Sequence, residues 1–294
     1  MIFLIFVVNR FIMKLKFFGT LVLLLFSTTF LFAQKIEKIK GSGIIKIASK
    51  EIESFNSIEV EDNFTIDLEK GETSGLKIEA DDNLHDVITT VVKNNVLVIA
   101  TSKEAHGFKK LSVRITYTND LNLVTSKDEA IVNAIQEISV ENITFKSMNK
   151  SKLFLNANVT NFNLQADDKS KVELNLKSEN AFIELSKYSN LKALINSAEL
   201  KFDLYQKATA SIEGDSDNTI ARLDNSSELN ARNFNSKNID ATVEDTANCS
   251  IFAETSCTLE ATDKAEINLY GNPTITIRKL SGEAKLFKKL PPKK

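Results

Sequence analysis

The sequence contains no tryptophan, 2 histidines, 2 cysteines, 3 prolines and 9 glycines in 294 residues. Histidine is the side chain that acid–base catalysis and metal binding use most readily, so its scarcity weakens any interpretation as an enzyme. No HExxH helix, GxSxG turn or glycine-rich phosphate loop occurs. We therefore expect a non-enzymatic protein with no catalytic triad, no cofactor and no metal site.

Charge of one sign is not in excess, because 37 basic residues face 39 acidic ones and the formal net charge is -2. Nucleic-acid-binding domains are usually strongly basic, so no nucleic-acid partner is expected. No cysteine precedes Cys249. The lipid-modified cysteine that follows a bacterial lipoprotein signal is therefore absent.

One long apolar run opens the chain and is not expected to belong to the folded core. Basic residues precede apolar residues 17–31, and the small residue Ala33 follows. This order is typical of a secretory signal peptide over residues 1–33, with Met13 as an alternative start. A retained membrane anchor is the other interpretation, but the run is short for a span. We expect an exported protein (periplasmic, outer-membrane-associated or extracellular) with no integral membrane anchor after cleavage.

Small residues recur at intervals of 17 to 20 residues through the second half of the chain. Each lies in a polar turn and is followed by a strand-like segment, as in ADDKSKVELNL. A fixed period near twenty is typical of solenoid proteins. These small residues, called the anchor column below, are Ser151, Ser170, Ser189, Ala208, Ser227, Ala247, Ala265 and Gly282.

Apolar and polar residues alternate on both sides of each anchor. Val172 and Leu174 stand two and four residues after Ser170, with Glu173 between them, and Leu164 stands six residues before it. Alternation with a period of two predicts strands with one buried face. No helix-length apolar pattern separates these strands, so they are expected to stack coil on coil. The predicted fold is an all-β, right-handed parallel β-helix (solenoid) with coils of about 19 residues.

Asparagine and aspartate recur two residues before the anchor. Both residue types tolerate left-handed backbone angles and form tight turns, so a left-handed turn residue is predicted there. The residues in this turn column are Asn149, Asp168, Asn225, Asp245 and Asp263.

The last coil departs from the pattern. With Gly282 as its anchor, Ile275 and Ile277 lie one residue away from the inward columns. This displacement indicates a shortened turn with a one-residue slip in strand register.

Both cysteines, Cys249 and Cys257, fall in inward columns. Free buried cysteines behave as small apolar side chains, and this interpretation is favoured. A disulfide is the alternative, because an exported protein can form one.

Residues 41–126 are also rich in strand-like segments, but the 19-residue register is not clean there. We expect irregular coils that continue into the regular coils of residues 127–290, because no linker rich in proline, glycine or serine separates them. A single β-solenoid domain over residues 34–294 is therefore predicted. The segment DDNLHDVI is expected to form a short helix or turn capped by Asp82 or Asn83.

Three stretches, taken in order, resemble a known family: GSGIIKIASKEIESFNSIEVEDNFTIDLEKG, LKIEADDNLHDVITTVVKNNVLVIAT and YGNPTITIRKLSGEAKLFKK. Over residues 41–290 the chain resembles the putative auto-transporter adhesin, head GIN domain family of bacterial exported proteins. The resemblance implies a right-handed β-helix-like fold, a role in surface adhesion and no catalytic residues. Turns in that family are often glycine-rich, whereas here only Ser281 and Gly282 keep a Ser-Gly pair.

Two groups of carboxylates offer chemistry as well as structure. Glu79, Asp81 and Asp82 carry the oxygen ligands that calcium prefers, although a solvated turn that caps the following segment is the favoured interpretation. Asp245 and Asp263 occupy one column in successive coils, about 4.8 Å apart by strand spacing. Retaining glycosidases need a similar carboxyl separation. A carbohydrate-active enzyme is therefore the alternative function, although turn formation also explains these two aspartates.

Positive charge collects beside the early anchors, whereas the same flanking columns later carry Glu228, Glu266 and Glu283. A row of lysines attracts an anionic polymer through additive point charges. A solvated edge that keeps the coils soluble is the simpler explanation. The lysines of this candidate ridge are Lys150, Lys152, Lys169, Lys171 and Lys207.

The sequence as a whole favours an exported β-solenoid that acts as a cell-surface or envelope adhesion or binding protein. The candidate partner is an anionic polysaccharide or envelope polymer. A ligand-free structural protein of the envelope is a further alternative, beside the carbohydrate-active enzyme.

Overall fold

The computed structural model describes residues 37–290, and the structural statements below concern these residues. The predicted signal peptide over residues 1–33 lies outside this range. No described helix is long and apolar enough to cross a membrane. The single helical element described is a 3-10 turn, η1 (Asp82–Leu84), and the other elements are β-strands.

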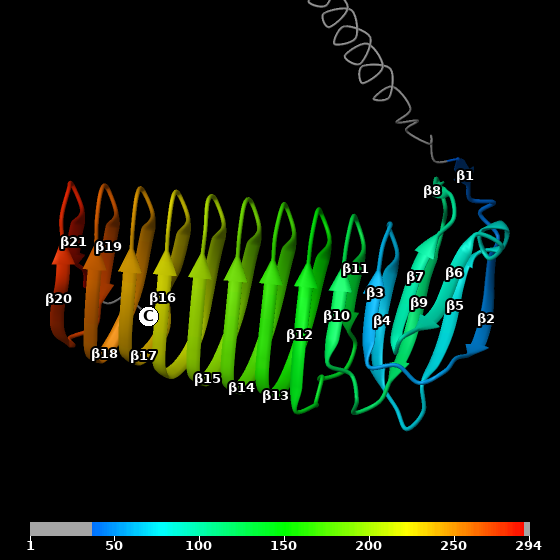
Figure 1. Cartoon of the computed structure of the whole chain (residues 1–294), viewed down its shortest axis with the longest axis horizontal. Helices are drawn as coiled ribbons and strands as arrows, with labels where there is room; N and C mark the ends of the chain where they lie inside the picture. The colour runs from blue at the N-terminus through cyan, green and yellow to red at the C-terminus, as the bar shows by residue number, and fades with distance from the viewer. Residues whose placement is uncertain (1–36, 291–294) are drawn as a thin grey trace, which may run out of the picture. The chain divides into compact units, whose positions relative to one another are not determined.

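Parallel strands stacked side by side form the larger, C-terminal part of residues 37–290 (Figure 1). Leu153 lies beside Val172, and Val172 lies beside Leu191, so neighbouring strands keep a constant offset of one coil. Each long strand serves two faces of the solenoid, because residues 152–154 of β13 pair with β11 whereas residues 161–166 pair with β12. The strands are β10 (Leu123–Ser126), β11 (Ile131–Ala134), β12 (Asn142–Ser147), β13 (Lys152–Ala166), β14 (Lys171–Leu185), β15 (Asn190–Leu204), β16 (Thr209–Leu223), β17 (Glu228–Val243), β18 (Asn248–Ala261), β19 (Glu266–Tyr270), β20 (Thr274–Leu280) and β21 (Lys285–Lys288).

The predicted inward columns form one continuous apolar core. Leu153, Val172 and Leu191 expose 1%, 1% and 0% of their surface, whereas Glu173 and Lys192, the next residues along the chain after the last two, face solvent. The alternation read from the sequence therefore assigns the buried face correctly. The prediction of an all-β solenoid with coils of about 19 residues is confirmed.

The turns contain the predicted left-handed residue. Its φ lies between 57° and 61° at Asn149, Asp168, Asn225, Asp245 and Asp263, which confirms the turn column. Lys187 and Gln206 take the same conformation, with φ of 55° and 60°, in the two coils whose turns lack asparagine or aspartate there. The left-handed conformation costs a non-glycine residue about 1–2 kcal/mol, so the stacked coils impose this backbone even where the side chain does not favour it.

The bend midway along the long strands carries a column of polar side chains, most of them asparagine amides, that hydrogen bond from coil to coil. Asn161 Nδ2 donates to Asn142 Oδ1 at 2.7 Å, and Asn180 Nδ2 donates to Asn161 Oδ1 at 2.9 Å. Farther along the same column, Asn238 Nδ2 donates to Asn218 Oδ1 at 3.0 Å. Such stacked amides reinforce the backbone ladder between coils. The solenoid is thus held at its turns, at its bends and in its core, while the outward side chains remain free to vary.

The N-terminal strands fold back on themselves before the coils become regular. β3 and β4 pair with β7 and β9 on one side and with β10 and β11 on the other. An early segment therefore lies between two later ones. The strands are β1 (Lys38–Lys40), β2 (Ile45–Glu51), β3 (Ser57–Val60), β4 (Thr65–Lys70), β5 (Gly75–Asp81), β6 (Ile88–Lys93), β7 (Val96–Thr101), β8 (Glu104–His106) and β9 (Leu111–Tyr117).

The irregular coils expected in this half occur only in part. β2 is antiparallel to β5, β5 is antiparallel to β9, and β6 is antiparallel to β7. These strands lie against the first coils instead of continuing the parallel stack. Alternating sequences do not reveal strand direction, which is why the expectation of coils alone was incomplete.

The turn after β5 differs from the predicted capping. Asp81 precedes η1, and no side chain caps its first turn, so neither Asp82 nor Asn83 is the cap. Asp81 is fully buried, and its carboxylate accepts hydrogen bonds from the backbone N–H groups of Gly43 at 2.7 Å and Lys110 at 2.9 Å. Asp81 therefore ties two loops together instead of standing in a solvated turn.

The last coil has a different anchor from the predicted one. Its backbone hydrogen bonds place Ala284 beside Ala265 in the anchor column, and Gly282 takes the left-handed turn position with φ of 72°. The turn is therefore not shortened. The register slip is real, but it lies within β20, where the pairing shifts between Leu259 and Glu260 of β18.

Candidate ligand-binding ridge

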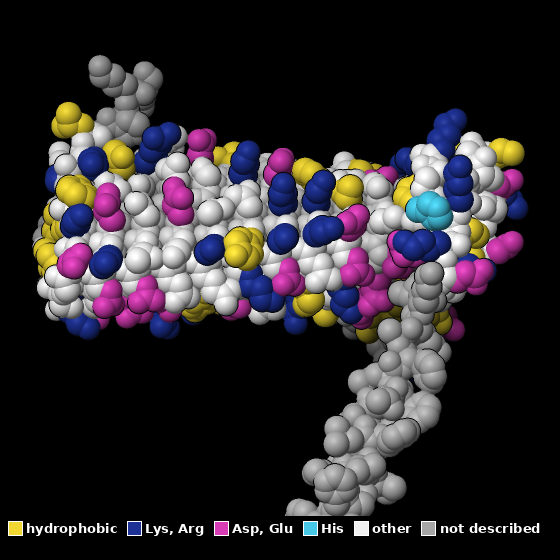
Figure 2. Space-filling model, turned by 90° about the horizontal axis from the view of Figure 1, so that it is seen from above, with side chains coloured by type: hydrophobic (Ala, Val, Ile, Leu, Met, Phe, Trp, Pro, Cys, Tyr) yellow, Lys and Arg dark blue, Asp and Glu magenta, His cyan; other side chains and the backbone are white. Residues whose placement is uncertain are grey.

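The predicted lysines line the turn edge of the solenoid. Lys150 and Lys169 each directly precede the buried anchor in successive turns, and Lys207 takes this position two turns later. One residue past the anchor, Lys152 and Lys171 are register partners in β13 and β14. Figure 2 shows Lys and Arg side chains along the turn edge, with Asp and Glu side chains among them. The structure therefore brings the lysines into two adjacent rows.

Two ridge lysines are already engaged. Lys150 Nζ lies 2.8 Å from the Glu129 carboxylate, and this hydrogen bond raises the pKa of Lys150 above its usual value. Lys207 Nζ lies 5.3 Å from the centre of the Tyr188 ring, in a cation–π contact. The other ridge lysines form no ion pair and no cation–π contact with any residue from 37 to 290; they are Lys152, Lys169 and Lys171.

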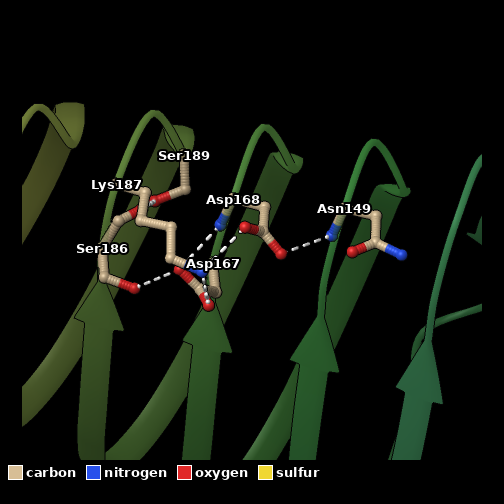
Figure 3. A network of polar contacts seen from close by, with 6 residues as sticks. All are labelled: Asn149, Asp167, Asp168, Ser186, Lys187 and Ser189. Carbon is tan, nitrogen blue, oxygen red and sulfur yellow. Dashed lines mark hydrogen bonds and ion pairs between the residues drawn. The ribbon is translucent and has the colours of Figure 1, made fainter. Parts of the chain in front are cut away.

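The backbone under the ridge is held by a network of side chains (Figure 3). Lys187 donates to Asp168 at 2.7 Å and to Asp167 at 2.9 Å, which raises the pKa of Lys187 to about 12. Burial alone would raise the pKa of Asp167, but hydrogen bonds from Lys187 and Ser186 hold it below its usual value. Asp168 also accepts from the backbone N–H of Asn149 at 3.2 Å, which links two turns. The positive charge of Lys187 is thus compensated by Asp167 and Asp168. Lys187 stabilises the turns under the ridge but adds no free positive charge to it.

The charge along these columns changes sign towards the C-terminal coils. After Lys171, the register column passes through Asn190 and Thr209 to Glu228. Farther along, Glu266 lies beside Lys285. Lysines in both rows of two successive coils therefore occur only in the early coils, whereas Lys264 and Lys285 stand singly in the same columns farther along.

The stacked aspartates of the alternative enzyme hypothesis serve the turns. Asp245 and Asp263 both lie in the left-handed region, with φ of 57° and 61°. Asp245 accepts a hydrogen bond from Asn225 Nδ2 at 2.9 Å, and Asp263 accepts one from Thr262 Oγ1 at 2.8 Å. These hydrogen bonds explain both carboxylates as parts of the turns, so no catalytic role is needed to account for them.

The carboxylates considered for calcium do not form a shared site. Asp81 faces the backbone of Gly43 and Lys110, whereas Asp82 accepts from the Ser42 hydroxyl. Burial would raise the pKa of Asp81, but its backbone hydrogen bonds lower it below the usual value. Within residues 37–290, no group of three or more His, Cys, Asp and Glu side chains could hold a metal ion.

Both cysteines are free and buried, in agreement with their inward columns. Burial raises the pKa of the Cys257 thiol to about 12, and burial also raises the pKa of Cys249. Thiols in such surroundings are unreactive, because the thiolate form is suppressed. They therefore pack as small apolar residues of the core.

Two residues that contact the ridge lysines, Glu129 and Tyr188, do not stand out in the sequence because neither is a lysine. Glu129 directly precedes Ala130, which is buried like the anchors of the later coils, and Tyr188 directly precedes Ser189. Following this column through every coil, instead of following lysines alone, would have found both. They matter because Glu129 forms an ion pair with Lys150 and the Tyr188 ring makes a cation–π contact with Lys207.

The fold and the ridge together define a class of protein: a parallel β-solenoid whose outward turn edge, and not an enclosed pocket, carries its candidate binding groups. A family model described as "Putative auto-transporter adhesin, head GIN domain" matches residues 54–194 and 172–273. The chain belongs to this family, and the resemblance noted in the sequence is confirmed. No curated protein matches the chain.

Solved structures share the fold at low sequence identity. A putative adhesin from Parabacteroides distasonis is 16% identical, with a TM-score of 0.65 over 86% of this chain and 100% of that one. A putative lipid binding protein from the same species is 14% identical, with a TM-score of 0.64 over the same shares of both chains. A putative adhesin from Parabacteroides merdae is 16% identical, with a TM-score of 0.60 over 85% of this chain and 98% of that one. At these identities the likeness shows the fold alone.

Proposed function

We propose that this protein is an exported, non-enzymatic adhesion protein that binds an anionic polysaccharide of a cell surface or envelope through the lysine ridge. The observation that carries the proposal is the pair of lysine rows, in which Lys152 and Lys171 are register partners and Lys150 and Lys169 stand in successive turns. Membership of an adhesin family supports the adhesion role.

The ridge geometry suits a long, regularly charged polymer. Successive coils repeat at about 4.8 Å, so the lysines present positive charge at closely spaced steps along the solenoid axis. Each contact at an exposed site is weak, but the contacts add along a polymer. Binding is therefore expected to be modest in affinity and to fall steeply with salt.

Export is supported by the sequence and the family together. The basic and apolar order before Ala33 is typical of a secretory signal, and an adhesin acts outside the cytoplasm. After cleavage the protein would be periplasmic, outer-membrane-associated or extracellular. Fractionation of cells that express the full chain, with immunodetection and N-terminal sequencing of the exported form, tests this part.

The alternatives predict different behaviour. The enzyme hypothesis gains no support from Asp245 and Asp263, which are used in turns. A ligand-free structural protein would carry the same lysines only for solubility, and would bind no polymer.

Binding to a defined polymer separates these cases. Residues 34–294 would be tested by biolayer interferometry against immobilised polygalacturonic acid, with dextran as the neutral control. We expect binding to polygalacturonic acid at low salt, loss at high salt and no binding to dextran. Equal binding to both polymers, or to neither at low salt, would contradict the proposal.

A further inference from the structure

The C-terminal end of the solenoid leaves its apolar interior uncovered by the described residues. Ile275 and Ile277 of β20 are register partners of Cys257 and Leu259 in β18. Those partners expose 1% and 2% of their surface, whereas the two isoleucines expose 41% and 49%. Leu280 of the same strand is also exposed. The columns that bury a side chain in the preceding coils therefore present bare apolar surface in the last one.

The same end offers unpaired strand edges. β20 pairs with β18, and β21 pairs with β19, and no strand within residues 37–290 pairs with the other edge of either. A free strand edge carries backbone N–H and C=O groups that another strand can satisfy. An extended peptide can bind such an edge by adding as a further strand. Its backbone hydrogen bonds then give affinity, and its side-chain contacts with the apolar columns give selectivity.

The edge is basic, which restricts the strand that fits it. Arg278 pairs with Asp240, and Lys279 lies 3.9 Å from Glu260, so these two cations are compensated by earlier coils. Three further lysines of the last coil form no ion pair with any residue from 37 to 290, although one of them, Lys285, is the register partner of Glu266; they are Lys285, Lys288 and Lys289.

These charges argue against a second copy as the occupant. Two such edges meeting would bring uncompensated lysines against each other, and like charges facing across strands are destabilising. β2, which is an edge strand among the N-terminal strands, is also basic through Lys46 and Lys50. Lysines on an edge are a known device against self-pairing, and the same repulsion selects for an acidic partner.

We propose that the open end formed by β20 and β21 is a docking site for an acidic, extended segment of a different protein, which adds as a further β-strand. Its backbone would pair with the free edge of β20, and its apolar residues would cover Ile275 and Ile277. Its carboxylates would face Lys288 and Lys289, because Lys288 Nζ reaches Asn272 in the bend directly before β20. This site is separate from the lysine ridge and does not depend on polysaccharide binding.

The probe is a synthetic peptide of alternating glutamate and valine, about ten residues long to span a full strand. A lysine–valine peptide of the same length is its charge-reversed counterpart. Binding to residues 34–294 would be measured by fluorescence anisotropy, and amide hydrogen exchange would locate it. We expect binding of the acidic peptide alone, with new protection confined to β20 and β21.

Matched variants separate strand addition from general charge attraction. Ile277→Ser should weaken peptide binding about tenfold, because it removes the apolar contact at the edge. Ile220→Ser is the control, because Ile220 is similarly exposed, at 52%, on β16, and it should change nothing. The double variant Lys288→Glu, Lys289→Glu should reverse the preference towards the lysine–valine peptide.

Several outcomes would overturn the proposal. They are no binding of the acidic peptide at low salt, protection outside the last coil, or equal weakening by Ile277→Ser and Ile220→Ser. A dimer in sedimentation that Ile277→Ser disrupts would assign the edge to a second copy instead. Tighter binding to vesicles of anionic lipid than to the peptide would assign it to a membrane surface. Polygalacturonic acid binding by Ile277→Ser reports on the ridge separately, and should be unchanged.

Discussion

Lys152 and Lys171 are register partners in β13 and β14, with no ion-pair partner among the described residues for either ammonium group. Parallel strands lie about 4.8 Å apart, so two like charges face each other on the surface. This arrangement is mildly unfavourable for the free protein. A bound polyanion would relieve it, so under the proposed function the ridge would couple a small stability cost to binding.

Replacing one of these lysines by an acid should separate the two effects. Lys171→Glu creates a cross-strand ion pair with Lys152, so we expect a gain of about 0.5 kcal/mol or less in unfolding free energy at low salt. The same variant should bind polygalacturonic acid more weakly. Thermal melts at low and high salt check the first effect, because screening should abolish the gain. A gain that persists at high salt would contradict an electrostatic origin.

The inward columns should control stability and the outward ones should not. Leu174 is 4% exposed, so Leu174→Asp places an unpaired charge in the core and should cost more than about 3 kcal/mol. Glu173→Gln changes only the exposed neighbour on the same strand and should stay within about 0.5 kcal/mol of the wild type. Chemical denaturation of both variants tests this. Equal midpoints would mean that the strand register is wrong.

Asp81 should make stability depend on pH in the acid range. Its pKa in the folded protein lies below the ordinary value of 3.8, so its contribution is complete above that value and is lost as the pH falls through the folded pKa. Asp81→Asn removes this titrating group and should lower the melting temperature at neutral pH. The difference from wild type should be constant at pH values well above 3.8 and should shrink as the pH falls below 3.8. A difference that stays constant below that value as well would exclude a role for the ionised carboxylate.

The turn column should prefer asparagine where the chain now has glutamine. Gln206 has φ of 60°, and asparagine accepts this left-handed conformation more readily than a longer side chain does. Gln206→Asn should therefore raise the unfolding free energy by about 0.5 kcal/mol, whereas Gln206→Val should lower it. Thermal denaturation of the pair provides the measurement. Stabilisation by valine would refute the turn assignment.

Much of the regular solenoid follows from the sequence, because only inward side chains must fit a fixed column. Leu153, Val172 and Leu191 recur at the coil spacing, and burial confirms their face. The last coil was misaligned because Gly282, in a Ser-Gly pair, resembles an anchor. In the structure Gly282 occupies the left-handed turn site, and Ala284 is the anchor.

The order and direction of the N-terminal strands could not be predicted from the alternation of apolar and polar residues. β2, β5 and β6 alternate like the parallel strands, yet they pair antiparallel, and β3 and β4 lie between strands that come later in the chain. Alternation reports a buried face but names neither partner nor direction. The ridge was predictable because its lysines stand in the two columns that flank the anchor. Its contacts with Glu129 and Tyr188 were not, because these two residues occupy the column before the anchor in coils that have no lysine there.

The central claim is that the early lysines bind an anionic polymer. It is tested most directly by the affinity of residues 34–294 for polygalacturonic acid, measured for the wild type and for a variant with Lys150, Lys152, Lys169 and Lys171 all changed to Glu. The side chains point outward, so circular dichroism of the variant should match the wild type. We predict that the wild type binds at low salt, that affinity falls as salt rises, and that the variant shows no binding. Unchanged binding by a folded variant would contradict the account, and so would the absence of wild-type binding at low salt.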